Sequence, residues 1–153
     1  MIITIIPPLS IPNHLRRVSE LMDRVSHLLW PRAKPSDIIA DCINSDLVMW
    51  GVFDEGLFDG YEDALLGILV VYRRDYWRCK VLEEIVLSGY RMDEWLDELY
   101  EITDKYAEEI GCTIREIPGG RKGWLRRLSN YGYKASDLVH LECPVGQKRR
   151  QHQ

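Results

Sequence analysis

The sequence lacks closely spaced cysteine or histidine residues, long apolar runs and a large excess of one charge. Its four cysteines stand 31 to 37 residues apart, and its four histidines form no close pair. This spacing argues against a disulfide framework and against a zinc site, so we expect reduced thiols and no metal. The N-terminal apolar run stops at Pro7-Pro8, and the other apolar runs are only as long as a strand. We therefore expect no signal peptide, no membrane span and a soluble protein in the cytoplasm.

The composition itself is that of an ordinary globular domain. The chain has 153 residues, of which 46% are hydrophobic and 29% charged, and its formal net charge is −4. A chain of this length can bury a single core, so we expect one domain over residues 1–146 and a flexible basic tail over residues 147–153. The slight excess of acidic residues argues against a surface that binds nucleic acid over its whole extent.

Apolar periodicity and turn residues predict an alternation of strands and helices. The expected strands cover residues 1–6, 47–53, 65–72, 77–87, 112–117 and 138–143. The expected helices cover residues 13–29, 36–43, 92–110 and 122–131, with Asn13 and Ser36 as N-caps and Gly111 as a C-cap. Residues 73–76 are expected to form the turn of an antiparallel meander, and residues 54–63 an exposed acidic loop.

This order of elements resembles that of the GNAT N-acetyltransferase superfamily over nearly the whole chain. The resemblance implies an α/β fold with a mixed, mostly antiparallel central sheet of about six to seven strands, flanked by about four helices. Val81 to Leu87 resembles the family's fourth strand, Met92 to Ile110 its central helix, and Trp124 to Tyr133 the helix and turn that close its site. Because a fold does not carry a function with it, the residues at two family motifs decide what the resemblance implies.

The first motif is the loop that binds the pyrophosphate of coenzyme A before the central helix. The family pattern R/Q-x-x-G-x-G/A places small residues there, so that phosphate oxygens reach backbone N–H groups. The corresponding segment is Arg91-Met92-Asp93-Glu94-Trp95-Leu96. Only Arg91 matches, while Glu94 and Leu96 put negative charge and bulk at the two small positions. We therefore expect no bound cofactor.

The second motif is a tyrosine that acts as general acid, commonly four residues before the glycine of a Gly-Phe turn. Gly132-Tyr133 resembles that turn, but the residue four positions earlier is Leu128, which has no proton to donate. Tyr131 lies next to the turn and therefore on another face of the helix. With both motifs changed, the chain resembles a GNAT-shaped domain that no longer transfers acetyl groups, a pseudoenzyme.

The helix directly after the fourth strand, together with Leu128 at the acid position, resembles a further group of proteins. These are small GNAT-like proteins of tailed bacteriophages, including the internal virion protein of T7-like phages. The resemblance implies a phage virion or accessory protein, located in the host cytoplasm or in the virion.

A divergent N-acetyltransferase that uses acetyl-CoA is the alternative hypothesis. In it, Glu83 or Glu84 is the general base and Tyr131 or Tyr133 the general acid. Acetyl-CoA would then be held by Arg91 and by the backbone of Ile85, Val86 and Leu87. Adjacent strand residues point to opposite faces, so one of the two glutamates can face a cleft. The interpretation we favour is that both are edge or surface carboxylates that pair with Arg78 or Lys80.

A basic segment near the C-terminus supports a second alternative, association with nucleic acid. Its cations are Arg121, Lys122, Arg126 and Arg127, and they surround Trp124. The interpretation we favour places Trp124 in the core with Leu125 and Leu128, and the cations on the solvated side of an amphipathic helix.

Charge is unevenly distributed along the chain. Residues 92–110 carry eight carboxylates and one lysine, a net charge of −7, whereas residues 118–153 carry a net charge of +6. Such an acidic helix is usually a solvated face, but docking a basic surface would relieve its self-repulsion. The acidic loop 54–63, with Leu57, Phe58 and Tyr61, is a second candidate contact. Our first hypothesis is therefore a non-catalytic domain that acts through contacts with a protein partner or with itself.

Overall fold

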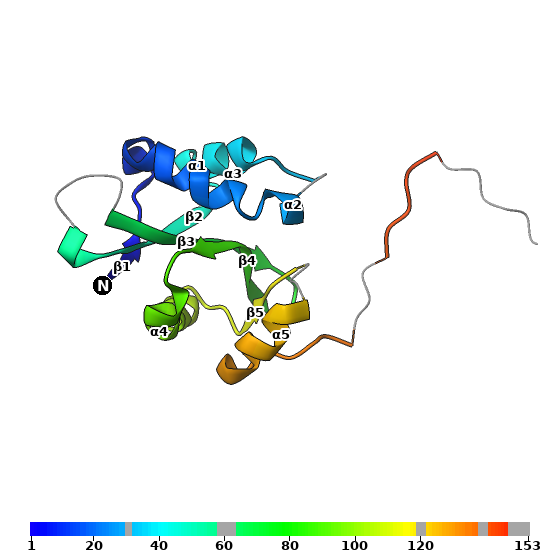
Figure 1. The fold of residues 1–153 in the computed structure, drawn as a ribbon. Coiled ribbons are helices and arrows are strands. Elements are labelled where there is room, and N and C mark those ends of the chain that lie inside the picture. Colours follow the sequence, from blue (N-terminus) through cyan, green and yellow to red (C-terminus); the bar gives the residue numbers. More distant parts are fainter. Residues whose placement is uncertain (30–31, 58–63, 119–121, 138–140, 147–153) are drawn as a thin grey trace, which may run out of the picture. The chain divides into compact units, whose positions relative to one another are not determined.

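The computed structural model describes residues 1–29, 32–57, 64–118, 122–137 and 141–146 (Figure 1). The chain divides into two compact units, residues 1–119 and residues 120–153. The strands of the first unit are β1 (Ile2–Ile5), β2 (Val48–Phe53), β3 (Leu65–Asp75), β4 (Lys80–Gly89) and β5 (Ile114–Glu116). Its α-helices are α1 (Leu15–Asp23), α2 (Ser26–Leu29), α3 (Pro35–Ile43) and α4 (Leu96–Glu109), and 3-10 turns cover Pro8–His14, Glu55–Leu57 and Met92–Glu94. The second unit contains α5 (Lys122–Leu128) and a 3-10 turn at Ser129–Tyr131.

The five strands form one mixed sheet in the order β1-β2-β3-β4-β5. β1 to β4 are antiparallel to their neighbours, which confirms the predicted meander, and β5 runs parallel to β4. Parallel neighbours need a crossover connection, and here α4 supplies it. The predicted α/β class and the mixed, mostly antiparallel sheet are thus confirmed, although the described chain has five strands rather than six or seven.

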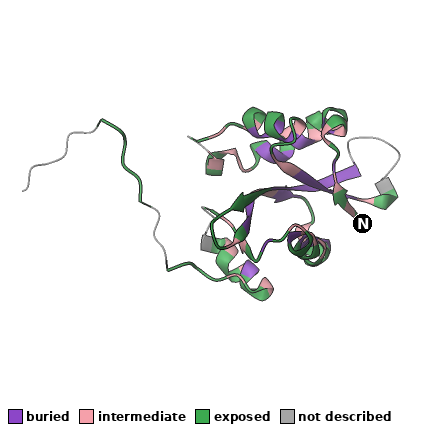
Figure 2. Cartoon of the chain, turned by 180° about the vertical axis from the view of Figure 1, so that it is seen from behind, coloured by how far each residue is buried: buried purple, intermediate pink, exposed green. Residues whose placement is uncertain are grey.

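Helices cover both faces of this sheet, with α1 and α3 on one side and α4 on the other (Figure 1). One core cluster joins α1 and α3 to the sheet through Val18, Leu21 and Ile38, which pack with Ile68 and Val70 of β3. On the other face the buried residues of α4 include Leu96, Leu99 and Ala107. Most of β2 and β4 and the first seven residues of β3 are buried, whereas the outer sides of the helices are exposed (Figure 2).

The helices of the first half begin at different residues from those predicted. Asn13 lies inside the 3-10 turn that Pro8 and Pro12 occupy, so α1 begins only at Leu15. Ser36 is not the N-cap of α3, because Lys34 takes that position and Pro35 is the first helical residue. The backbone N–H of Lys34 donates to the Asp37 carboxylate at 2.9 Å. This side-chain cap places the N-cap two residues earlier than predicted.

The turn between β3 and β4 also differs from the prediction. β3 continues through Asp75, and the turn lies at Tyr76–Cys79, where the Tyr76 N–H donates to the Cys79 carbonyl at 2.9 Å. The predicted turn at 73–76 is therefore wrong. Arg73 and Arg74 are exposed strand residues. Because neither face of the strand is buried here, the sequence shows no alternation of apolar and polar residues that would mark it as a strand.

The two ends of α4 are determined by local backbone conformation. Arg91 has φ 57° before the 3-10 turn that leads into the helix, and Gly111 has φ 84° after it. The C-cap of α4 is Ile110, and the predicted Gly111 follows it directly, because glycine adopts this left-handed conformation without strain.

The C-terminal strand predicted at 138–143 is not found in the described part of this segment. Residues 138–140 lie outside the described residues, and Leu141–Cys143 have no strand conformation. The predicted tail, residues 147–153, also lies outside the described residues, as do residues 58–63 of the predicted acidic loop. Gly132 has φ 88° and ends the 3-10 turn at the predicted Gly-Tyr position.

Candidate functional site

The candidate site lies at the carboxyl end of β4, where the sheet is incompletely paired. β5 pairs with β4 only through Val81, Leu82 and Glu83. Within the described chain, the edge of β4 from Ile85 to Leu87 therefore has no strand neighbour on the β5 side. The ladder with β3 also shifts here, since Val70 pairs with Val86 and Val71 with Glu84, which leaves Ile85 as a bulge residue.

Glu83 is 7% exposed and lies in register with Tyr72 of β3. Two N–H groups of Arg74 donate to its two carboxylate oxygens, the second at 3.2 Å. The Arg74 side chain is half exposed. Both oxygens that could accept a proton from a substrate are thus already hydrogen-bonded to a cation.

Glu84 is 4% exposed and points to the opposite face of the sheet, as adjacent strand residues do. Its carboxylate accepts a hydrogen bond from Arg115 Nη2 at 3.1 Å. Arg115 also donates to the Tyr100 carbonyl at 3.4 Å, and its guanidinium carbon lies 4.7 Å from the centroid of the Tyr100 ring. The predicted pairing of both glutamates with Arg78 or Lys80 is therefore wrong, because the partners are Arg74 and Arg115.

Arg91, the one residue that matches the family's phosphate loop, is held by two carboxylates. Its guanidinium donates to Asp54 at 2.8 Å and to Glu94 through Nε at 2.9 Å. The hydrogen bonds that Arg91 donates to these carboxylates, Glu94 first, raise the pKa of Arg91, and the bond from Arg91 is the main cause that lowers the pKa of Asp54. The positive charge of Arg91 is thus balanced within the chain.

Trp95 fills the space beside this loop. Its indole is 1% exposed, and its Nε1 donates to the Tyr90 carbonyl at 2.7 Å. Gly67 and Gly89, which pair across β3 and β4, leave room for the ring: a Cβ on Gly67 would lie 2.6 Å from Trp95 Cζ2. The two glycines are therefore used to pack a side chain of the protein.

Backbone N–H groups of the loop are partly engaged within the chain. Those of Glu94 and Trp95 donate to the carbonyls of Arg91 and Met92 at 3.0 and 3.1 Å. The Tyr90 N–H donates to the Leu66 carbonyl at 2.8 Å. Helix N-termini bind phosphate through N–H groups that have no intrachain acceptor, so these three are not available to an anion.

Comparison with known proteins identifies the fold. No family model matches the sequence, and no curated protein sequence matches it. A probable acetyltransferase matches the structure with a TM-score of 0.71 at 12% identity, over 97% of this chain and 100% of that one. Glucosamine-6-phosphate N-acetyltransferase from Arabidopsis thaliana matches with a TM-score of 0.65 at 12% identity, over 94% and 99%. A predicted acetyltransferase with acetyl-CoA from Clostridium acetobutylicum matches with a TM-score of 0.66 at 10% identity, over 92% and 95%.

The chain has the GNAT acetyltransferase fold. Structural matches at 10–13% identity show the fold alone, so the chemistry of this chain has to be inferred from its own residues. At the end of β4, the unpaired edge from Ile85 to Leu87 fits an extended group such as a pantetheine arm. The loop from Arg91 to Leu96 does not fit a pyrophosphate, because carboxylates surround its arginine and an indole fills the adjacent space. The donor set of the GNAT cofactor site is thus present only in part.

The remaining candidate residues lie in the unit of residues 120–153. Tyr131 and Tyr133 are half-buried, and Leu128 is buried. Of the predicted basic patch, Arg126 is exposed and Arg127 lies with its guanidinium carbon 5.7 Å from the Trp124 ring centroid. Arg121 and the side chain of Lys122 lie outside the described residues. Trp124 is half-buried and Leu125 is 45% exposed, so the prediction that both belong to the core is wrong for Leu125.

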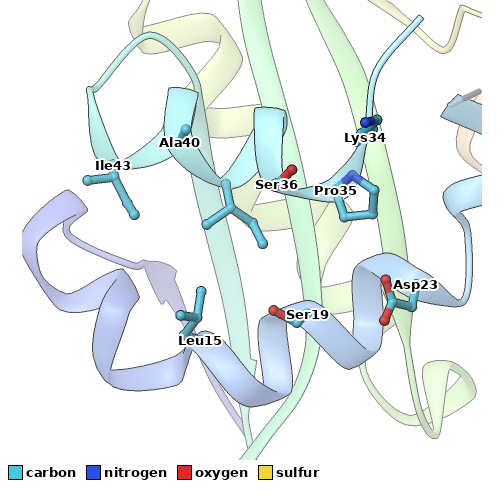
Figure 3. Close-up of a pocket in the computed structure, with 9 residues that line it drawn as sticks. Leu15, Ser19, Asp23, Lys34, Pro35, Ser36, Ala40 and Ile43 are labelled. Atoms are coloured by element: carbon cyan, nitrogen blue, oxygen red, sulfur yellow. The ribbon is translucent and has the colours of Figure 1, made fainter. Parts of the chain in front are cut away.

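A separate groove of about 670 Å³ lies between α1 and α3 (Figure 3). Leu15, Ser19 and Asp23 of α1 face the residues of α3, and none of the residues singled out as catalytic or cofactor-binding lines it. In the described part of the chain, no helix is long and apolar enough to cross a bilayer, and no group of three or more His, Cys, Asp and Glu side chains could hold a metal.

Sequence reasoning missed the partners that define this site, namely Asp54, Arg74, Arg115 and the pair Gly67 and Gly89. Asp54 is 37 residues from Arg91, and Arg115 is 31 residues from Glu84. Contacts this far apart leave no trace in local periodicity. The one available signal was the glycine in each of two otherwise apolar strand segments, which marks close approach of another group.

Proposed function

We propose that this chain is a GNAT-fold domain that does not transfer acetyl groups and acts through contacts with other protein surfaces. The observation that carries the proposal is the pairing of Arg91 with Asp54 and Glu94. A pyrophosphate would have to displace both carboxylates from Arg91 and then lie beside them. Like charges at such short range destabilise a complex.

The packing of Trp95 supports the same proposal. To widen the space beside the loop, the indole would have to leave Gly67 and Gly89 and break its hydrogen bond to the Tyr90 carbonyl. Exposing a buried tryptophan costs on the order of 3 kcal/mol. An acetyl-CoA site made in this way would be correspondingly weak.

We extend the proposal to a role as a structural or accessory component of a tailed phage. It is supported by the 3-10 turn and helix α4 that follow β4 and by Leu128 at the position of the general acid. In such a role the GNAT fold would provide surfaces for protein contacts and would not catalyse a reaction.

Thermal unfolding with and without acetyl-CoA tests the proposal. A ligand present at 100 times its Kd stabilises the folded state by about 2.7 kcal/mol, which raises Tm by several degrees in a protein of this size. We expect the same Tm at every concentration of acetyl-CoA. A Tm that rises with acetyl-CoA, and not with ATP as a matched polyphosphate control, would contradict the proposal.

The second candidate function is a divergent acetyltransferase, which the unpaired backbone edge from Ile85 to Leu87 supports. Glu83 or Glu84 would then act as the base, Tyr131 or Tyr133 as the acid, and acetyl-CoA would lie along this edge. Chromatographic detection of coenzyme A released from acetyl-CoA in the presence of a panel of amines tests this candidate. Release that Glu83→Gln or Glu84→Gln abolishes in a folded protein would establish it in place of the first proposal.

A further inference from the structure

The β3–β4 hairpin ends in a cluster of exposed aromatic side chains, in residues 72–80, which we call the hairpin tip. Trp77 is 103% exposed, Tyr76 51% and Tyr72 39%. The Tyr76 N–H bond to the Cys79 carbonyl closes the turn, so this cluster has a defined shape. A tryptophan entirely in solvent is unusual in a monomeric protein, and exposed apolar patches mark interaction sites.

The segment that carries these rings is also rich in cations. The hairpin tip has four of them, Arg73, Arg74, Arg78 and Lys80, and one carboxylate, Asp75, for a net charge of +3. Arg74 lies 5.6 Å from the centroid of the Tyr72 ring. Within the described chain, neither Arg78 nor Lys80 forms an ion pair with a carboxylate. The tip therefore carries an exposed indole and, in the same hairpin, two cations that are still available to a partner.

A protein partner fits this surface better than a nucleic acid. Arg73 is paired with Asp75 and Arg74 with Glu83, so only two of the four cations remain to neutralise phosphates. Tryptophan, tyrosine and arginine are also the residues that contribute most to the binding energy of protein interfaces. The partner surface should then offer an apolar spot bordered by carboxylates.

α4 carries such a surface beside the face that packs on the sheet. Ile102 and Tyr106 are half-buried, and Glu98 and Glu109 are exposed one turn away on the adjoining strip of the helix. The Tyr106 ring is held by an edge contact with Trp50, with centroids 5.3 Å apart. Residues 92–110 carry a net charge of −7, so the hairpin tip and α4 are oppositely charged.

These two surfaces adjoin on the same chain. Arg73 Nη1 donates to the Ile110 carbonyl at 3.3 Å, and the Thr113 N–H donates to the Lys80 carbonyl at 3.0 Å. In a two-fold dimer each chain uses the same patch, so one contact is made twice. We propose that the hairpin tip docks on α4 of a second copy, with Trp77 against Ile102 and Tyr106 and with Arg78 and Lys80 against Glu98 and Glu109. This inference goes beyond the proposed function, since a dimer of this kind could form with or without acetyl transfer.

Sedimentation equilibrium of the full chain tests the dimer and its contacts. We expect the average mass to approach that of two chains as the protein concentration rises to about 100 μM. We also expect the dissociation constant of the dimer to rise with salt concentration. Trp77→Ala should weaken the dimer at least about tenfold, and so should the charge reversals R78E/K80E or E98K/E109K. Combining the two charge reversals in one chain should recover most of the affinity, because it restores opposite charges across the interface.

Two matched variants control for unspecific effects. Leu9→Ala removes a side chain that is 90% exposed but lies outside both surfaces, and R126E/R127E alters the basic segment of residues 120–153. Both should leave the dissociation constant unchanged, and far-UV circular dichroism should show that every variant is folded. Acetyl-CoA binding by the dimer would contradict the proposed function and leave this inference intact.

Three results would overturn the inference. The first is a wild-type chain that is monomeric at the highest concentration, and the second is a dimer whose affinity Trp77→Ala or the charge reversals do not change. The third is a monomer that binds a fluorescent oligothymidine with an affinity that depends on Trp77 and falls steeply with salt, which would assign the hairpin tip to nucleic acid.

Discussion

Glu83 and Glu84 are neighbours in the chain but belong to ion pairs in different environments. The side chains of Glu84 and Arg115 are 2% and 10% exposed, whereas Arg74, the partner of Glu83, is 50% exposed. A buried carboxylate that keeps its charge requires a partner, and removal of that partner leaves an uncompensated charge. Both residues therefore stabilise the fold as they stand.

This difference predicts unequal effects of two matched substitutions. Glu84→Gln leaves the buried Arg115 with only the exposed and more distant Asp104, at 3.9 Å, as a counter-charge, and should lower the free energy of unfolding by about 3 kcal/mol. Glu83→Gln leaves Arg74 able to reach water and should cost about 1 kcal/mol. Urea unfolding monitored by circular dichroism measures both. Equal losses would show that the two pairs are not buried to different degrees.

The Arg91–Asp54 pair makes a prediction about pH. Hydrogen bonding to Arg91 lowers the pKa of Asp54, so the stabilisation from this pair is complete above the ordinary pKa of an aspartate. It is lost as the pH falls through the lowered pKa of the folded state. Arg91→Met should raise the pKa of Asp54 toward its ordinary value, with part of the depression retained through the Gly56 N–H. Carboxyl carbon NMR titration measures this, and an unchanged midpoint would mean that Arg91 is not its main partner.

At the scale of the elements, the approach of α4 to the sheet depends on two glycines. A Cβ on Gly89 would lie 2.9 Å from the Gly67 Cα and within 3.0 Å of the Trp95 ring. Gly89→Ala should therefore destabilise the protein by about 1–3 kcal/mol, and Trp95→Leu in the same chain should relieve part of that loss. Gly123→Ala in α5 is the control, since among the described residues no atom outside its own helical turn and chain neighbours lies within 4 Å of its Cβ position, and it should be neutral or stabilising. Additive effects of the substitutions at Gly89 and Trp95 would contradict direct packing.

The elements also show what could be predicted from sequence. The meander and the end of α4 at Gly111 followed from local apolar periodicity and from one glycine, because each depends on neighbouring residues. The turn was predicted at residues 73–76 instead of Tyr76–Cys79, because the exposed residues of the hairpin show no alternation of apolar and polar side chains. The pairs Glu84–Arg115 and Arg91–Asp54 could not be predicted, because they join residues brought together only by the sheet.

For the whole molecule, the GNAT fold is retained while the features that would bind acetyl-CoA are retained only in part. The unpaired edge of β4 remains, but the loop after it is occupied by the protein's own side chains. The charged side chains are concentrated on two surfaces, the positively charged hairpin tip and the negatively charged α4. This distribution of charge supports the proposal that the molecule acts through contacts with protein surfaces.

Isothermal titration calorimetry of the full chain with acetyl-CoA tests this account most directly. The account predicts only the heat of dilution, both for the wild-type chain and for Trp95→Phe, which keeps most of the packing. A saturable heat with a micromolar Kd in the wild-type chain, weakened by Arg91→Met, would show that Arg91 leaves its two carboxylates for the pyrophosphate and would contradict the account.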